Sequence, residues 1–171
     1  MTVKMKAFKR IKAYGVYDGP QWAVNYGELT PGSGTGEEVP RLFQALGEKL
    51  PFEALAKVRT FLKKEGIRRT GVYIAHDSMT YARYIGHGNI FQRLAAHKNS
   101  LELKYISFYV VEDKKYEREI ETLLIRAAGP LLQFNTNKKR LTISVGNITD
   151  YEAGTLFFER RYKKGAKRKH A

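Results

Sequence analysis

The chain has 171 residues, of which 43% are hydrophobic and 28% are charged, a balance that supports one packed domain and excludes wholesale disorder. It contains no cysteine, which excludes disulfides, thiolate metal sites and cysteine nucleophiles. Its 31 lysines and arginines against 17 acidic residues give a net charge of +14, which favours a polyanionic partner, most commonly nucleic acid. No run approaches the roughly 20 apolar residues of a membrane span, and residues 1–12 lack the apolar run of a signal peptide, so we expect a soluble, cytoplasmic protein with no membrane partner.

Two kinds of pattern precede residue 70. Alternating or β-rich segments predict strands at 1–12, 14–17 and 22–26. The first of these segments is alternatively a basic arm. Asp18-Gly19-Pro20 is a strong turn signal between the last two. After a Gly-rich loop at 30–36, helices are expected at about 37–48 and at 51–66.

From residue 70 strands and helices alternate. The predicted elements are a hairpin of strands at 71–75 and 81–85, a helix at 89–97, a strand at 101–111, a helix at 114–128 and a short strand at 141–145. Gly129-Pro130 ends the long helix. This order predicts an α/β (α+β) fold: a small, mainly antiparallel sheet flanked by helices, with an N-terminal extension and a basic C-terminal tail.

Within residues 70–140, several polar side chains stand where core packing does not require them. Tyr73 closes a Gly-Val-Tyr triplet, and Tyr84 opens a Tyr-Ile-Gly triplet on the second strand of the hairpin. Arg93 and His97 lie four residues apart on the next helix, so they share a face and can serve one site. Glu121 lies on the long helix beyond them.

This ordered series resembles the GIY-YIG nuclease family, over about 70 of the 171 residues. The two triplets of the family's name appear as Gly71-Val72-Tyr73 and Tyr84-Ile85-Gly86, with valine in place of one isoleucine. The other matching features follow in the family's order: Gly88-Asn89-Ile90 before Arg93, then Glu121, Pro130 and Asn135.

Two intervals differ from the family's pattern. The interval from Gly86 to Arg93 is slightly shorter than in the repair-nuclease relatives. The interval from Pro130 to Asn135 is longer, so Asn137 is a rival for the role of Asn135. A second Gly-Val-Tyr, at residues 15–17, lacks the following Arg-x-x-x-His and is interpreted as unrelated.

The resemblance implies a divalent-metal-dependent DNA endonuclease that uses Mg²⁺ or Mn²⁺ to hydrolyse phosphodiester bonds. It assigns Glu121 as the metal ligand and Tyr73 as the group that takes the proton of the attacking water, with Tyr84 positioning the water or the phosphate. His97 is the alternative proton acceptor or a phosphate contact. The size and layout fit a restriction-type or stand-alone nuclease, and a homodimer is plausible because cutting both strands needs a second site. A structure-specific or single-strand nuclease and a non-catalytic nucleic-acid-binding module are the alternatives.

These residue types suit the chemistry, because attack on an anionic phosphodiester needs a cation at the phosphate and an activated nucleophile. The carboxylate of Glu121 is a hard oxygen ligand for Mg²⁺, and Arg93 offers a planar fork of donors to phosphate oxygens. A free tyrosine has a pKa of about 10, so Tyr73 needs Arg93 or the metal to lower it, whereas a free histidine titrates near 6.5. The sequence leaves open whether Tyr73 or His97 is the base.

Each of these residues also has a purely structural explanation. Tyr73 and Tyr84 suit a half-buried sheet, where tyrosine is common. Glu121 suits a surface ion pair of little energetic consequence. Glu117 and Glu119 are alternative carboxylates on the same helix, and only its spacing to the following proline favours Glu121 over them.

Further nucleic-acid contacts are expected outside the catalytic motif. His87 beside the hairpin and Asn135 are two candidates. The others are the cations of the C-terminal tail: Arg160, Arg161, Lys163, Lys164, Lys167, Arg168 and Lys169. We interpret the tail as a DNA-backbone clamp, with a solubilising end as the alternative. The chain then divides into an extension with a possible DNA-recognition element at 1–69, a nuclease core at 70–140, and a strand segment with the basic tail at 141–171.

Overall fold

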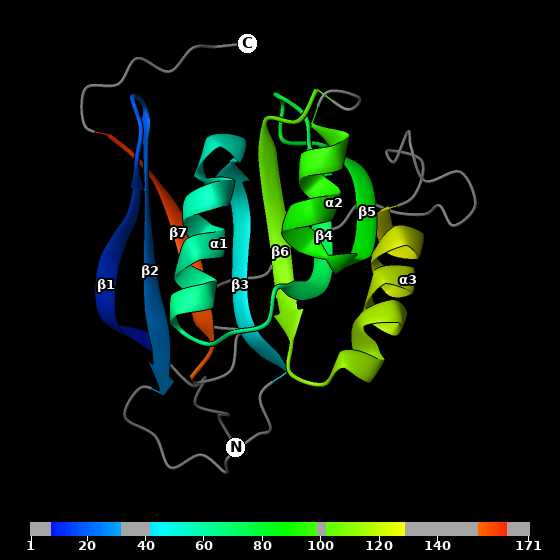
Figure 1. Cartoon of the computed structure of the whole chain (residues 1–171), viewed down its shortest axis with the longest axis horizontal. Helices are drawn as coiled ribbons and strands as arrows, with labels where there is room; N and C mark the ends of the chain where they lie inside the picture. The colour runs from blue at the N-terminus through cyan, green and yellow to red at the C-terminus, as the bar shows by residue number, and fades with distance from the viewer. Residues whose placement is uncertain (1–7, 32–41, 99–101, 129–153, 164–171) are drawn as a thin grey trace, which may run out of the picture.

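A seven-stranded sheet runs across the molecule in the order β1-β2-β7-β3-β6-β4-β5 (Figure 1). The computed structural model describes residues 8–31, 42–98, 102–128 and 154–163. The strands are β1 Phe8–Asp18, β2 Trp22–Pro31, β3 Phe43–Pro51, β4 Thr70–His76, β5 Ala82–Asn89, β6 Tyr105–Val111 and β7 Leu156–Tyr162. The helices are α1 Leu55–Lys64, α2 Ile90–His97 and α3 Glu117–Ala128, with single turns of 3₁₀ helix, η1 Phe52–Ala54 and η2 Lys114–Tyr116, before α1 and α3. None of the helices in these ranges is long and apolar enough to cross a membrane.

The α+β class is confirmed and the sheet is mainly antiparallel as expected, but it is neither small nor purely antiparallel. The sheet is mixed, because β7 enters it between β2 and β3 and runs parallel to β3, while the other neighbouring pairs are antiparallel. It is also large, because strands from the N-terminal extension and from the C-terminal segment join those of residues 70–111 in one ladder. One continuous sheet therefore contains strands from all three predicted parts of the chain.

The helix expected at about 37–48 is also wrong where the structure describes it. Residues 43–51 form β3, which pairs with β6 on one side and with β7 on the other. Ala45, Leu46 and Leu50 are good helix formers, yet they are buried in the middle of the sheet. Tertiary pairing therefore overrides local propensity here. The remainder of that predicted helix, and the short strand at 141–145, lie outside the described residues.

Most other predicted elements are confirmed. The hairpin signals at Asp18-Gly19-Pro20 and at 71–85 correspond to the antiparallel pairs β1–β2 and β4–β5. The predicted helices at 51–66, 89–97 and 114–128 correspond to η1 with α1, to α2, and to η2 with α3. These segments carry their own signals of periodicity, turns and caps.

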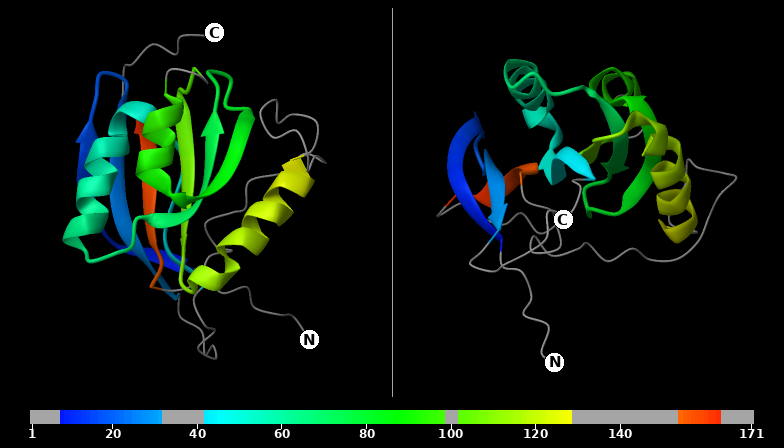
Figure 2. Two further views of the ribbon diagram at one scale, coloured as in Figure 1. Left: turned by 45° about the vertical axis from the view of Figure 1, so that its right-hand side comes forward. Right: turned by 90° about the horizontal axis from the view of Figure 1, so that it is seen from below.

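Helices cover both faces of the sheet and enclose two apolar cores (Figure 2). The larger core lies under α1 and α2 and includes Leu62, Leu94 and Phe108. The smaller core lies under α3, where Ile125 packs with Ile74 and Ile85. The strands β4 and β5 are therefore held between α2 on one face and α3 on the other.

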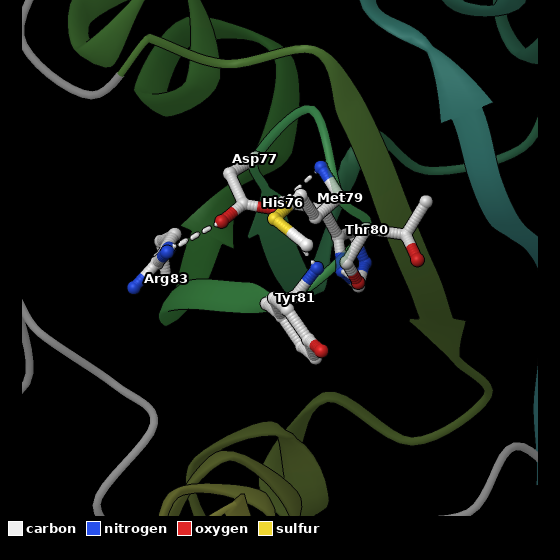
Figure 3. Close-up of polar contacts among 6 residues, drawn as sticks. All are labelled: His76, Asp77, Met79, Thr80, Tyr81 and Arg83. Carbon is white, nitrogen blue, oxygen red and sulfur yellow. Dashed lines mark hydrogen bonds and ion pairs between the residues drawn. The ribbon is translucent and has the colours of Figure 1, made fainter. Parts of the chain in front are cut away.

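The turn between β4 and β5 is fixed by side chains (Figure 3). The Asp77 carboxylate accepts hydrogen bonds from the backbone N–H of Met79 at 2.9 Å and of Tyr81 at 3.0 Å, and it also binds the guanidinium of Arg83 at 2.6 Å. Thr80 has a φ of 68°, in the left-handed region that residues other than glycine rarely adopt. Several hydrogen bonds therefore hold a strained turn in one conformation.

Buried His76 joins this turn to the middle of the sheet. Its Nδ1 donates to the carbonyl oxygen of Thr80 at 3.1 Å, and its Nε2 accepts from the hydroxyl of Ser107 at 2.8 Å. The same hydroxyl accepts the backbone N–H of Lys49 at 2.9 Å, which sets its proton toward the histidine. Because His76 is only 5% exposed and both of its nitrogens are bonded, it is a structural residue rather than a phosphate contact.

Acid should destabilise the protein through His76. Burial, with the nearby charges of Lys49 and Arg160, lowers the pKa of His76 from 6.5 to about 4. Between these values the unfolded chain takes up a proton that the folded chain cannot, so stability falls as the pH drops from 6.5 to 4 and levels off below. The expected loss is about 3 kcal/mol, measured by urea unfolding across that range. The variant His76→Gln should show a flatter dependence, and an unchanged slope would contradict this account.

Candidate active site

The two tyrosines of the candidate site lie on neighbouring strands at the sheet edge. In the antiparallel pair of β4 and β5, Tyr73 stands opposite Gly86, and Ala75 stands opposite Tyr84. This register puts both phenol rings on the face that α2 covers, with ring centroids 6.0 Å apart. Tyr73 is only 1% exposed, whereas Tyr84 is half-buried.

Helix α2 brings the arginine and the histidine of the motif to the same face. The side chain of Asn89 caps the helix by accepting the backbone N–H of Gln92 at 3.2 Å, which gives one physical reason for an asparagine here. His97 lies beside Tyr84, with ring centroids 4.8 Å apart. Arg93 is exposed, and its charge acts on the hydroxyl of Tyr73.

Glu121 approaches from the opposite face of the sheet. Its carboxylate is 15% exposed and lies 3.7 Å from Nε2 of His87, whose position on β5 is opposite Val72 and hence on the α3 face. Its charge nevertheless acts on Tyr73, because β5 is the edge strand and carries only glycine at position 86. The site therefore extends around the edge of the sheet.

The alternative carboxylates of α3 are placed differently. Glu119 is exposed, and Glu117 is 3% exposed with a buried Oε1 that has no hydrogen-bond partner among the described atoms. Of the three carboxylates, Glu121 is the one whose charge acts on Tyr73, and its role as metal ligand stays a prediction.

Two glycines of the motif have steric reasons. A Cβ at Gly86 would lie 2.5 Å from Oη of Tyr73 and 2.9 Å from Cε1 of Tyr84, so the two rings occupy the space that a side chain would need. A Cβ at Gly71 would collide with the backbone carbonyl oxygen of Tyr109 on β6. By contrast, a Cβ at Gly15, in the unrelated Gly-Val-Tyr, would meet only Asn25 Oδ1 at 3.9 Å. The Gly-Val-Tyr at residues 71–73 and the one at residues 15–17 therefore have the same sequence, but their glycines are packed differently.

The environment of Tyr73 keeps its hydroxyl protonated in the free protein. Burial is the main cause that raises its pKa above the ordinary value, and the charge and hydrogen bond of Tyr84 and the charge of Glu121 raise it further. Arg93 acts in the opposite direction but does not outweigh burial. To act as a base, Tyr73 needs a cation that lowers its pKa. Arg93 alone does not lower it enough.

The donor set suits one weakly held divalent ion. No group of three or more histidine, aspartate and glutamate side chains that could hold a metal occurs within the described ranges. Glu121 offers one carboxylate at the sheet edge, and Mg²⁺ commonly binds through one or two carboxylates while keeping waters and substrate phosphates. The residues present therefore fit an ion completed by substrate, rather than a preformed metal cage.

The C-terminal cations are not all part of a tail. Arg160 and Arg161 belong to β7, where Arg161 pairs with Glu159 at 3.1 Å, and Lys163 pairs with Asp18 at the end of that strand. Arg160 is half-buried between the rings of Trp22 and Tyr105. The other predicted contacts lie outside the described residues, and they are Asn135, its rival Asn137, Lys164, Lys167, Arg168 and Lys169.

The pairing of β7 with β2 could not be expected from the sequence, because the two strands are distant in the chain. It brings Arg160 over the indole ring of Trp22, so this cation of the predicted DNA-backbone clamp lies within the sheet.

Comparisons with known proteins add no identification. A scan against protein-family models, a search of curated proteins and a search of solved structures each found no match. The argument for a site therefore depends on the motif resemblance and on the geometry described above.

The steric role of position 86 can be tested by Gly86→Ala. The added methyl group must displace the rings of Tyr73 and Tyr84, so we expect the free energy of unfolding to fall by about 1–3 kcal/mol in chemical denaturation. Gly15→Ala is the matched control, since it also lies in a strand but has open space, and it should change stability by less than about 0.5 kcal/mol. Equal effects of the two variants would show that the rings do not depend on this glycine.

Proposed function

We propose that the protein is a divalent-metal-dependent DNA endonuclease that hydrolyses phosphodiester bonds. The observation that carries the proposal is the surroundings of the Tyr73 hydroxyl on β4. Tyr84 from β5 packs beside Tyr73, and the charges of Arg93 from α2 and Glu121 from α3 act on its hydroxyl.

Each group has a chemical task in such a reaction. The exposed guanidinium of Arg93 suits the non-bridging oxygens of the scissile phosphate. Glu121 would hold the Mg²⁺ or Mn²⁺ ion, which when bound supplies positive charge to the phosphate. Tyr84 lies between Tyr73 and His97 and would position the water or the phosphate.

The proton acceptor remains a choice between Tyr73 and His97. The raised pKa of Tyr73 argues against a phenolate in the free protein, so Tyr73 acts as the base only if bound metal and substrate reverse the effect of burial. His97 is half-buried beside Tyr84 and is the alternative acceptor. A restriction-type role and a homodimer stay predictions.

The alternative that one observation favours is a non-catalytic nucleic-acid-binding module. Tyr73 is 1% exposed and belongs to the larger apolar core, as a purely structural tyrosine would. A module that had lost catalysis would still bind nucleic acid through its basic charge but would not cut it. Cleavage assays separate the two functions.

The ionisation state of Tyr73 can be measured directly. In protein labelled with ¹³C at tyrosine Cζ, and without metal or DNA, the Tyr73 resonance should keep its phenol position beyond pH 10, because burial disfavours the phenolate. Comparison with Tyr73→Phe assigns the signal. A Tyr73 signal that moves at or below pH 10 would mean that the charge of Arg93 outweighs burial.

The nuclease proposal is tested with supercoiled plasmid in Mg²⁺, in Mn²⁺ and in EDTA. Nicking or linearisation should require the metal and should disappear in Glu121→Ala. Glu119→Ala is the matched control, because it removes an exposed carboxylate two residues away on the same helix and should cut normally. If Tyr73 is the base, Tyr73→Phe should slow cutting by about 10²- to 10⁴-fold.

The same assay shows what would reject the proposal. Cutting that persists in EDTA, or that is equal in Glu121→Ala and Glu119→Ala, contradicts a metal at Glu121. Salt-sensitive binding without any cutting of duplex, single-stranded or branched DNA would favour the binding module.

A further inference from the structure

A second cluster of aromatic and cationic side chains lies away from the candidate active site. Trp22 at the start of β2, Tyr105 at the start of β6, and Arg160 and Tyr162 on β7 meet at the end of the sheet that is uppermost in Figure 1. Lys49 on β3 lies at the same end, two residues before the position that pairs with Tyr105. We call these five residues the Trp22 cluster. It lies one strand from β4, which carries Tyr73.

Arg160 is a desolvated cation that the described protein does not neutralise. Its guanidinium carbon lies 4.1 Å from the centroid of Trp22 and 4.7 Å from that of Tyr105. Burial lowers its pKa, its buried Nη1 has no hydrogen-bond partner, and no carboxylate in the described ranges forms an ion pair with it. A buried charge without a counter-charge is costly, so an anion at this place would be favourable.

Neighbouring cations make the contrast clear. On the same strand Arg161 pairs with Glu159, and just beyond it Lys163 pairs with Asp18. Arg83, in the hairpin turn next to His76, pairs with Asp77. Among the described residues, carboxylates pair with these three cations but not with Arg160.

Lys49 adds a second cation under backbone strain. Its φ is 50°, in the left-handed region where glycine would be unstrained, and its backbone N–H is held by Ser107. Its ammonium forms no ion pair with any described carboxylate, and its charge, like that of Arg160, lowers the pKa of His76. Both positive charges therefore act on the region of His76, where the charge of Asp77 acts in the opposite direction.

The exposed member of the cluster is Tyr162. This residue is 47% exposed, and its ring centroid lies 3.5 Å from that of Trp22. On Trp22 lies the guanidinium of Arg160, which also contacts the ring of Tyr105. Exposed aromatic rings beside cations bind unpaired nucleobases by stacking and their phosphates by charge. Bases inside a duplex are already stacked on each other and cannot use such a ring.

We infer that the Trp22 cluster binds single-stranded nucleic acid, with a base stacked on Tyr162 and a phosphate held between Lys49 and Arg160. This inference rests on the proposed function, because it takes nucleic acid as the substrate. It adds that an unpaired segment of the nucleic acid binds outside the candidate active site. It also assigns Arg160, one cation of the predicted DNA-backbone clamp, to a surface formed by several strands of the sheet.

Trp22 is the only tryptophan in the chain, so tryptophan fluorescence reports on this site. The full-length protein in EDTA, where metal-dependent cutting cannot occur, is titrated with a thymidine oligonucleotide, an abasic oligonucleotide of equal length and a matched duplex. The thymidine oligonucleotide should change the tryptophan emission in a salt-dependent manner. The abasic strand and the duplex should change it much less. An oligouridine of the same length shows whether the sugar matters.

Two variants test the assigned roles. Tyr162→Ala should weaken binding of the thymidine oligonucleotide by about 5- to 100-fold, the effect of losing one stacked base. Lys49→Gly should lower the salt slope of log K by about 0.7, for one lost phosphate contact, while the melting temperature does not fall because the backbone strain is relieved. A merely structural lysine would not separate these two readouts. Lys57→Gln, on the exposed side of α1, is the control and should bind normally.

The inference is overturned if the emission does not change, if duplex or abasic DNA changes it equally, or if both variants bind like the wild type. These results are independent of the nuclease assay. If the tryptophan emission does not change but nicking depends on Glu121, only the Trp22 cluster is rejected as a binding site. A tryptophan response without any nicking supports the cluster and rejects only the nuclease.

Discussion

The candidate site depends on one steric constraint, the lack of a side chain at position 86. The phenol of Tyr73 occupies the space that a Cβ of Gly86 would need, and Tyr84 closes in from the same strand. Because Gly86 lies on the edge strand β5, the hydroxyl of Tyr73 is within electrostatic reach of α2 on one face and of α3 on the other. A side chain at this position would displace the rings of Tyr73 and Tyr84.

The parts of the structure that could be predicted from the sequence are those specified locally. The turn at Asp18-Gly19-Pro20, the cap at Asn89 and the apolar spacing of α3 each depend on residues within a few positions. The hairpin of β4 and β5, with α2 and α3, carries the residues predicted to be catalytic, whose role stays a prediction. The steric reason for Gly86 became visible only with the register of β4 and β5.

The parts that could not be predicted are set by partners distant in the chain. β3 reads as a helix because Ala45, Leu46 and Leu50 are good helix formers, and it is a strand because β6 and β7 pair with both of its edges. The sequence assigns the residues from Arg160 onward to a basic tail, yet residues 160–162 complete β7, which pairs with β2. The same long-range pairing creates the Trp22 cluster, whose members come from four strands, so no local pattern could announce it.

Charge pairing distinguishes the structural cations from those that the fold leaves without partners. Arg83, Arg161 and Lys163 pair with carboxylates and fix turns or strand ends. Within the described ranges Arg93 and Arg160 have no such partner, and both lie beside aromatic side chains, Arg93 near Tyr73 and Arg160 on Trp22. The net charge of +14 favours contact of a polyanion with such positions. A nucleic-acid strand bound at both Arg93 and Arg160 would also place a phosphate next to Tyr73. In the free protein, burial rather than the charge of Arg93 sets the protonation state of the Tyr73 hydroxyl.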